Sequence, residues 1–294
     1  MTEHLFFGAQ PLKLSRLGYG AGQLGGDHLT QNDVDRLLDQ LRDAGINLID
    51  TARGYGASEE RLGKYLKKHP EAFHISTKVG YGIPGYEDWT HDVILAGIET
   101  ALKTLSCETL DIVHLHSCPR HVLERGDVIE ALLKAKASGK IRVAAYSGEN
   151  EDLVWAARSG YFDSLQCSVN LCDQWSLQQL LPHAVAAGFG IIAKRSLANA
   201  FWRFQKQPTG DYSEAYWLRW QAMRPYLEHV KPEEVALRFS AFAPEVHVAI
   251  TGTTNPKHLT RNLEAFNKGP LPESLQRDIR IAFARAEQDW GGEL

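Results

Sequence analysis

Residues 47–66 read NLIDTARGYGASEERLGKYL and combine two structural patterns. The first is a short apolar run that ends at Asp50 and is typical of a buried β-strand. The second begins at Ser58 and places apolar residues at helical spacing. Tyr55 lies in the turn between the two. The stretch therefore predicts a strand followed by a helix, which is the repeating unit of α/β proteins, with an acid and a phenol at the carboxyl end of the strand.

The same alternation continues in both directions along the chain of 294 residues. Strands are expected in the runs 15–20, 46–50, 73–78, 110–116, 141–147, 164–170, 190–196 and 246–251. Helical periodicity is found at 34–45, 59–68, 93–105, 128–140, 152–160, 177–188, 232–243 and 257–266. Eight such units in about 250 residues have the size of a (β/α)8 TIM barrel. A doubly wound open sheet is the alternative arrangement.

Three segments do not belong to a bare barrel. Residues 6–14, FFGAQPLKL, predict a hairpin across the barrel floor, and residues 272–290 predict an extra helix after the last unit. The connection 199–231 is long and contains a helix-like run with Trp217 and Trp220. Connections of this length are usually lids or additional packing elements. We expect one barrel domain over residues 1–294, with the role of the long connection open.

Composition excludes several functional classes. The net charge is −4 and the basic residues are scattered, which is not the pattern of a nucleic-acid-binding or anionic-membrane-binding surface. No run approaches the ~20 apolar residues of a membrane span. The amino-terminal residues also lack a basic start followed by a long apolar run, so a cytoplasmic location is expected. The four cysteines form no C-x-x-C pair and are too few for a disulfide framework, so reduced thiols are expected. Oligomeric state cannot be inferred from these features.

Polar side chains stand at the predicted ends of three successive strands. These side chains are Asp50, Lys78 and His116, and Tyr55 follows the first of them. Catalytic groups of a barrel lie at the carboxyl ends of strands, so the four are expected to share one pocket. A phenol has a pKa of about 10 and transfers protons poorly near neutrality unless a cation lies beside it. Lys78 is expected to supply that cation and Asp50 its counterion.

Such a group of residues is suited to carbonyl reduction. His116 would position and polarise a carbonyl oxygen, and Tyr55 would give the proton. No side chain can supply a hydride, so a nicotinamide cofactor is required. Each residue alone has a simpler explanation, for example Asp50 as a turn residue or Lys78 as a charge at the rim. The four residue types together, in this order and context, favour catalysis.

The pair His114 and His116 permits a different hypothesis, a metal site. Alternate strand residues face the same side, and an H-x-H pair begins the ligand set of some barrel hydrolases. The later predicted strands end in Ser147, Asn170, Lys194 and Thr253, which are poor metal ligands. No metal is therefore expected, and His114 is interpreted as a hydrogen-bonded interior histidine in a layer with His74 and Ser76.

Three motifs resemble the signatures of the aldo-keto reductase family. They are IDTARGYGASEERLG at 49–63, STK at 76–78 and DIVHLH at 111–116. The similarity extends from about residue 18 to residue 262. It implies a (β/α)8 NAD(P)H-dependent carbonyl reductase whose catalytic tetrad is Asp50, Tyr55, Lys78 and His116. In the family the tyrosine is the general acid, the lysine and aspartate tune it, and the histidine orients the substrate.

The resemblance also implies contacts to the nicotinamide half of the cofactor. Ser147 and Gln166 match residues that bind the carboxamide, although Gly148 stands where the family has an asparagine. Lys194 stands where an aromatic residue usually stacks on the nicotinamide, so Arg195 is expected to meet a phosphate instead. Leu197 fits the family pattern.

The segment 250–262 is similar to the part of the family that holds the adenosine half. Thr253 and Asn262 align with contact residues. Gly252 and His258 stand where many members have a lysine and an arginine for the 2′-phosphate, and Arg261 replaces a glutamate. His258, Arg261 and Asn262 share one helix face by their spacing, so His258 and Arg261 are expected to bind that phosphate. NADPH is favoured over NADH.

The sequence therefore predicts an NADP-dependent oxidoreductase that reduces a small aldehyde or ketone to the alcohol, or catalyses the reverse reaction. The alternative is an NADP(H)-binding regulatory or redox-sensing subunit with little turnover, because some family members have that role. The physiological substrate cannot be read from the chain.

Overall fold

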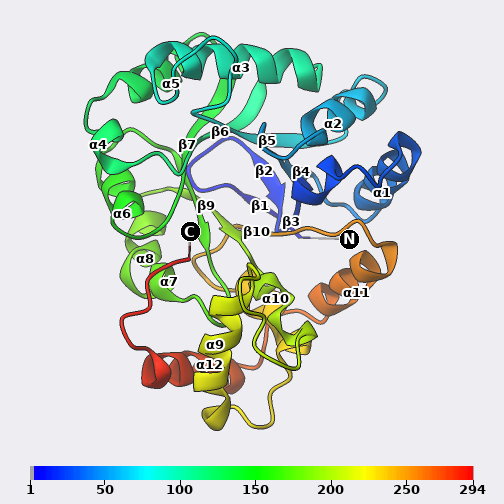
Figure 1. Cartoon of the computed structure of the whole chain (residues 1–294), viewed down its shortest axis with the longest axis vertical. Helices are drawn as coiled ribbons and strands as arrows, with labels where there is room; N and C mark the ends of the chain where they lie inside the picture. The colour runs from blue at the N-terminus through cyan, green and yellow to red at the C-terminus, as the bar shows by residue number, and fades with distance from the viewer. Residues whose placement is uncertain (1–2, 294) are drawn as a thin grey trace.

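The computed structural model describes residues 3–293, so Met1, Thr2 and Leu294 of the predicted domain lie outside the described residues. Eight parallel strands close into a barrel in the order β10-β3-β4-β5-β6-β7-β8-β9. Helices surround this barrel (Figure 1). Closure confirms the predicted (β/α)8 barrel, and the alternative of an open sheet is wrong.

All eight predicted strands are present. They are β3 (Leu17–Gly20), β4 (Leu48–Asp50), β5 (His74–Val79), β6 (Leu110–His116), β7 (Ile141–Ser147), β8 (Ser164–Ser168), β9 (Gly190–Lys194) and β10 (Val248–Thr251). Nearly every strand residue is buried, as expected for parallel strands that face side chains on one side and helices on the other.

The helices follow the predicted order. They are α1 (Gln31–Asp43), α2 (Ser58–Leu66), α3 (His91–Leu105), α4 (Arg120–Leu123), α5 (Asp127–Ala137), α6 (Asn150–Arg158), α7 (Trp175–Gln179), α8 (Leu181–Ala186), α9 (Glu214–Met223), α10 (Pro232–Ala241), α11 (Pro256–Asn267) and α12 (Glu273–Ala286), with short 3₁₀ turns η1 (Ala21–Gly25), η2 (Ala198–Arg203) and η3 (Arg224–Tyr226). The predicted additional carboxyl-terminal helix is α12.

Local sequence explains where α1 begins and which face it buries. The side chain of Thr30 accepts a hydrogen bond from the backbone of Asp33, and the Asp33 side chain accepts one from the backbone of Thr30. This reciprocal pair satisfies two backbone groups that a helix start leaves open. Val34, Leu38 and Leu41 then lie on one buried stripe at helical spacing.

One predicted helix is two. Residues 177–188 were expected to form a continuous helix, but α7 ends at Gln179 and α8 begins at Leu181. Pro182 is the physical reason, because it has no backbone N–H and its ring clashes with the carbonyl four residues earlier. Leu180 lies between the two helices and has non-helical backbone angles, with φ of −131° and ψ of −50°.

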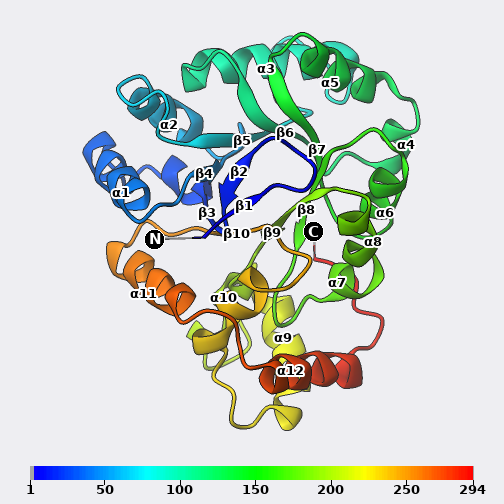
Figure 2. The same cartoon turned by 180° about the vertical axis from the view of Figure 1, so that it is seen from behind.

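The predicted amino-terminal hairpin closes one end of the barrel. Strands β1 (His4–Phe6) and β2 (Lys13–Ser15) pair antiparallel and cross the barrel opening (Figure 2). Phe7, Leu12 and Leu14 form one buried cluster with side chains of the barrel strands. A Cβ on Gly8 would lie 2.5 Å from the carbonyl oxygen of Gly188, so only glycine permits this close approach.

The long connection after β9 is a packed element. It contains η2, α9 and η3, and α9 lies beside α12 at the outer side of the barrel (Figure 1). Trp220 is buried, with its ring 5.6 Å from that of Phe201. The predicted helix of this segment is α9. Within residues 3–293, no helix is both long and apolar enough to span a bilayer.

Candidate active site

Three neighbouring strands bring the predicted catalytic side chains together. Asp50 and His116 are the last residues of β4 and β6, and Lys78 is the penultimate residue of β5. In the parallel register Asp50 lies opposite Ser76, and Lys78 lies opposite His114. The three side chains therefore meet at the carboxyl end of the barrel, as the sequence predicted.

An ion pair lies at the centre of this group. The Lys78 ammonium donates to Asp50 Oδ2 at 2.7 Å and to the carbonyl oxygen of Thr51 at 2.7 Å. Both charged side chains are buried. Burial alone would lower the pKa of Lys78, but the charges and hydrogen bonds of Asp50 and Tyr55 outweigh it and raise that pKa. Burial opposes ionisation of Asp50 as well, yet Lys78 holds the pKa of this carboxyl below its usual value.

Tyr55 lies directly beside this cation. The Lys78 nitrogen is 4.9 Å from the centre of the Tyr55 ring. The Tyr55 ring stands perpendicular to His116, with centres 6.4 Å apart. The loop comes close to η1, because a Cβ on Gly25 would lie 1.7 Å from the carbonyl oxygen of Tyr55. A phenol, a buried ammonium and an imidazole thus border one space.

A second layer fixes Asp50. Its Oδ1 accepts hydrogen bonds from Ser76 Oγ at 2.7 Å and from Gln166 Nε2 at 2.9 Å. Ser147 Oγ in turn donates to Gln166 Oε1 at 2.9 Å. The predicted carboxamide pair, Ser147 and Gln166, is therefore adjacent to the tetrad and linked to it by hydrogen bonds.

The two histidines of the H-x-H pair differ in their partners. His114 Nε2 is 3.0 Å from Ser76 Oγ, and burial lowers the pKa of His114 to about 3. His116 Nδ1 is 2.6 Å from the hydroxyl of Tyr81, and burial followed by the charge of Lys78 lowers the pKa of His116 to about 4. The expected contact between His114 and Ser76 is therefore present, while His74 Nδ1 is 2.9 Å from Asp111 Oδ1. Within the described residues, no group of three or more His, Cys, Asp or Glu is arranged to hold a metal.

The carboxyl ends of β7 to β9 carry a different set of charges. Lys194 Nζ lies 3.1 Å from Oε1 of Glu149, a fully buried carboxylate. That same oxygen accepts from the backbone N–H of Ser168 at 2.9 Å and from its hydroxyl at 2.8 Å. Arg195 donates to Ser168 Oγ at 2.9 Å and also to Tyr212. Lys194 and Arg195, predicted to meet the cofactor, are thus held by protein groups in this structure.

The carboxyl-terminal tail covers these charges. Asn150 and Gly292 exchange two hydrogen bonds, with distances of 2.9 and 2.6 Å, and Arg219 donates to the carbonyl oxygen of Gly291 at 2.9 Å. The carbonyl oxygen of Glu293 accepts a hydrogen bond from Arg195. A Cβ on Gly292 would lie 2.7 Å from Glu149 Oε2, so the tail passes directly over that carboxylate.

The predicted adenosine residues lie beyond the end of β10. Thr253 is buried and its carbonyl oxygen accepts from the Tyr19 hydroxyl at 2.9 Å. Across residues 3–293, the side chains of His258, Arg261 and Asn262 on α11 have no hydrogen bond or ion pair. His258 and Arg261 are exposed. Leu197, the remaining predicted contact, is partly buried and packs against the core.

Known proteins similar to this chain identify its family. A model of the Aldo/keto reductase family matches residues 16–282. The chain belongs to the aldo/keto reductase family. It is 27% identical to a D-threo-aldose 1-dehydrogenase from Pseudomonas sp, over 87% of this chain and 90% of the relative. It is 25% identical to the NADH-specific methylglyoxal reductase of Escherichia coli, over 95% of this chain and 98% of the relative.

A solved structure supports the fold as well. The holo form of an aldo-keto reductase from Bacillus halodurans has a TM-score of 0.81 to this chain, at 23% identity and 96% coverage of both chains. Members of the aldo/keto reductase family are oxidoreductases that use a nicotinamide cofactor, and carbonyl reduction fits the residues described above.

Two groups of residues offer polar or basic side chains of the kind that a nicotinamide cofactor needs. The Ser147–Gln166 pair lies next to Asp50, where polar groups can meet a carboxamide. On α11, His258 and Arg261 have basic side chains. Neither side chain has a hydrogen bond or ion pair within the described part of the chain. A Cβ on Gly252 would lie 2.6 Å from the carbonyl oxygen of Gly20. This close approach is sufficient to explain why position 252 is a glycine.

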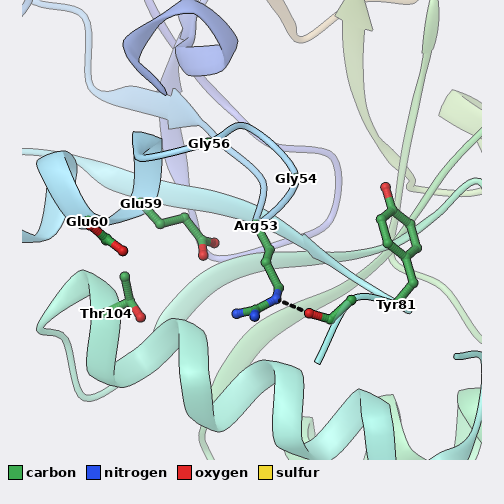
Figure 3. A pocket seen from close by; sticks show the side chains of 8 residues that line it. Arg53, Gly54, Gly56, Glu59, Glu60, Tyr81 and Thr104 are labelled. Carbon is green, nitrogen blue, oxygen red and sulfur yellow. Dashed lines mark hydrogen bonds between the residues drawn. The ribbon is translucent and has the colours of Figure 1, made fainter. Parts of the chain in front are cut away.

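A cavity of about 420 Å³ lies on the outer side of the loops after β4 and β5. Its lining includes Arg53, Glu59, Glu60 and Tyr81, but not Tyr55 or His116. Arg53 Nε donates to the carbonyl oxygen of Gly82 at 2.7 Å and so joins the two loops (Figure 3). Glu59 and Glu60 lie on the far side of Arg53 from Tyr81 (Figure 3).

Sequence reasoning missed two residues of the site. Tyr81 follows Lys78 by three positions, so an aromatic residue just past a catalytic strand end was the available signal. Glu149 follows Ser147 by two positions, and an acid so close to a predicted cofactor contact was a similar signal. The tail at Gly291 to Glu293 gave no local signal at all.

Proposed function

We propose that this aldo/keto reductase transfers a hydride between NAD(P)H and the carbonyl carbon of a small aldehyde or ketone, with Tyr55 as the proton donor. The observation that carries the proposal is the buried Asp50–Lys78 ion pair beside the Tyr55 ring and opposite His116. The nicotinamide, when bound, supplies the hydride. The reverse reaction, oxidation of an alcohol, uses the same groups.

Each member of the tetrad has a distinct task in this proposal. Lys78 places a positive charge beside the phenol and so stabilises the phenolate that forms when Tyr55 gives up its proton. Asp50 keeps that ammonium paired in a buried site, where an unpaired charge would be costly. His116 has a pKa of about 4, so it is neutral near pH 7 and can donate a hydrogen bond to the carbonyl oxygen.

The finer assignments of the cofactor site are part of the same proposal. Ser147 and Gln166 hold the carboxamide, and Thr253 and Asn262 hold the adenosine half together with the backbone at Gly252. The part of the cofactor between the carboxamide and the adenosine half is contacted by Lys194, Arg195 and Leu197. NADPH is preferred because His258 and Arg261 are exposed and unengaged on one face of α11. The NADH-specific relative shows that members of this family differ in this preference.

We also propose that the chain is a single barrel domain over residues 1–294 and that it acts in the cytoplasm. The four cysteines are all free thiols, and three of them are buried, which is the usual state in a reducing compartment. The substrate is a small carbonyl compound. The named relatives act on aldoses and on methylglyoxal, so short and sugar-derived carbonyls are the first compounds to test.

The test is consumption of NADPH and NADH by the purified protein with a panel of small, aromatic and sugar-derived aldehydes. Binding of each cofactor is followed separately by fluorescence. We expect turnover of at least one carbonyl, with NADPH bound more tightly than NADH. Tight binding without turnover of any carbonyl would contradict the reductase and would favour the regulatory alternative.

A further inference from the structure

Tyr81 is a second phenol in the active site. It lies two residues after the end of β5, and its hydroxyl is 2.6 Å from Nδ1 of His116. The two rings are stacked, with centres 5.5 Å apart and planes at 21°. A hydrogen bond in combination with ring stacking fixes both the position and the plane of the imidazole.

The surrounding loop holds Tyr81 in place. Trp89 packs edge-on against the Tyr81 ring at 5.7 Å. The backbone N–H of Trp89 donates to the carbonyl oxygen of Gly80 at 2.8 Å, and Arg125 donates to the carbonyl oxygen of Trp89 at 2.6 Å. A Cβ on Gly80 would lie 2.2 Å from the Trp89 ring, so the loop closes tightly on itself. Tyr81 therefore has little freedom to turn away from His116.

The direction of the hydrogen bond follows from the protonation states. Burial raises the pKa of Tyr81, so its phenol keeps its proton near pH 7. His116 is neutral there and carries one N–H. A phenol, with a reference pKa of about 10, is a far stronger acid than a neutral imidazole, and an imidazole nitrogen is the better acceptor. In the described residues the Tyr81 hydroxyl has no other hydrogen-bond partner.

We propose that Tyr81 is a positioning residue that donates its hydroxyl proton to Nδ1 of His116 and so holds His116 as the Nε2–H tautomer. The single N–H of the imidazole then points toward the space beside Tyr55, where it can donate to a carbonyl oxygen. Without this bond, the Nδ1–H tautomer becomes populated, and in that form Nε2 would offer a lone pair to the carbonyl oxygen. The assignment of the N–H to a carbonyl rests on the proposed function, whereas the tautomer does not.

The experiment compares three proteins labelled with ¹⁵N at histidine: the parent, Tyr81→Phe and Tyr161→Phe. Phenylalanine keeps the stacked ring and removes only the hydroxyl. Tyr161 is an exposed tyrosine with 49% relative accessibility, and its variant is the matched control. Two-bond ¹⁵N–¹H correlation spectra distinguish the tautomers, and His116→Gln identifies the His116 signals.

We expect the Nε2–H pattern for His116 in the parent and in Tyr161→Phe, and a mixture of tautomers in Tyr81→Phe. The net strength of one neutral hydrogen bond predicts a fall in kcat of about three- to tenfold in Tyr81→Phe, with cofactor Kd unchanged. A purely structural role for Tyr81 would not alter the tautomer. An Nδ1–H pattern in the parent, or an undisturbed Nε2–H pattern in Tyr81→Phe, would overturn the proposal.

The two proposals fail in distinguishable ways. If the parent turns over no carbonyl but its tautomer responds to Tyr81→Phe as described, the role of Tyr81 stands and the reductase function fails. If the parent is active and the tautomer is indifferent to Tyr81, the reductase stands and the positioning role is wrong.

Discussion

The two halves of the barrel mouth differ in how their charges are satisfied. At the ends of β4 to β6, Asp50 and Lys78 pair directly, and both Asp50 oxygens accept hydrogen bonds. At the ends of β7 to β9, Glu149 Oε2 and Asp173 Oδ1 are buried and have no hydrogen-bond partner among residues 3–293. The first half satisfies both oxygens of its buried carboxylate, although His114 Nδ1 lacks a hydrogen-bond partner among the described residues, whereas the second half leaves carboxylate oxygens of Glu149 and Asp173 without partners.

This difference parallels the proposed division between chemistry in the first half and cofactor binding in the second. A proton relay must be preorganised, so its charges and hydrogen bonds are already in place. The second half is the one proposed to meet the cofactor, and its charged side chains are held by hydrogen bonds to the segment 291–293. Changes in the first half are therefore expected to affect turnover, and changes in the second half to affect binding and stability.

The largest effect is expected from Lys78→Met. The phenol loses its neighbouring cation, and the buried Asp50 carboxylate loses its counterion while it keeps the hydrogen bonds from Ser76 and Gln166. We expect turnover to fall by about 10²- to 10⁴-fold and stability to fall by about 3–5 kcal/mol. Steady-state kinetics and urea unfolding measure the two effects. The double variant Asp50→Asn/Lys78→Met is the control, and it should regain stability but not activity. Recovery of activity in that variant would contradict the role of Lys78.

The pH dependence of stability should differ in sign between the halves. Burial lowers the pKa of His116 in the folded protein to about 4, below its usual value of 6.5, so its contribution to stability is full above pH 6.5 and is lost as the pH falls toward 4. Burial and then Glu149 raise the pKa of Asp173 from 3.8 to about 7, so its contribution is full below pH 3.8 and is lost as pH rises through 7.

Two variants isolate these contributions between pH 4.5 and 6.5. Relative to the parent, Asp173→Asn should gain stability as pH rises, and His116→Gln should lose it, each by at most about 1.4 kcal/mol per pH unit. Urea unfolding at several pH values measures both slopes. Slopes of the same sign would break the contrast between the halves.

A smaller effect is expected from Gly292→Ala in the tail. The new methyl group would lie 2.7 Å from Glu149 Oε2. Ser168 and Lys194 hold the other oxygen, Oε1, and so restrict how far this carboxylate can shift. We expect a loss of about 1–3 kcal/mol in the free energy of unfolding. In a Glu149→Ala background the same change should cost much less, because the clashing atom is absent. Equal costs in both backgrounds would show that the tail does not lie over Glu149.

The smallest effect concerns cofactor choice. His258→Ala and Arg261→Ala should each raise the Kd for NADPH about two- to fivefold, because exposed ionic contacts are weak. The Kd for NADH should not change, since NADH has no 2′-phosphate. Fluorescence titration of both cofactors measures this. A parallel loss of affinity for NADH would place these residues elsewhere in the site.

The sequence predicted the first half of the site far better than the second. Asp50, Lys78 and His116 each follow from a strand's periodicity and its end, and parallel strands bring such ends together. The helix break before Pro182 was also predictable, because proline interrupts a helix. The helical periodicity of residues 177–188 nevertheless led to the prediction of one continuous helix. By contrast, the tail contacts join residues 142 positions apart, as in Asn150 and Gly292. No local pattern encodes a pairing at that distance.

Tyr81 and Glu149 were less predictable than the strand-end residues but more predictable than the tail contacts. Both follow strand ends, so their proximity to the site was predictable, but their partners were not. The bond from Tyr81 to His116 depends on how the loop after β5 folds around Trp89. The bonds of Glu149 to Ser168 and Lys194 depend on the register of β8 and β9.

Tyr55→Phe tests the central claim most directly. Phenylalanine keeps the ring beside Lys78 and removes only the proton that Tyr55 is proposed to give. The measurement is single-turnover oxidation of bound NADPH by a carbonyl that the parent reduces, with the cofactor Kd determined on the same sample. The account predicts an unchanged Kd and a rate about 10²- to 10⁴-fold lower. Reduction at the parent's rate would show that Tyr55 is not the proton donor.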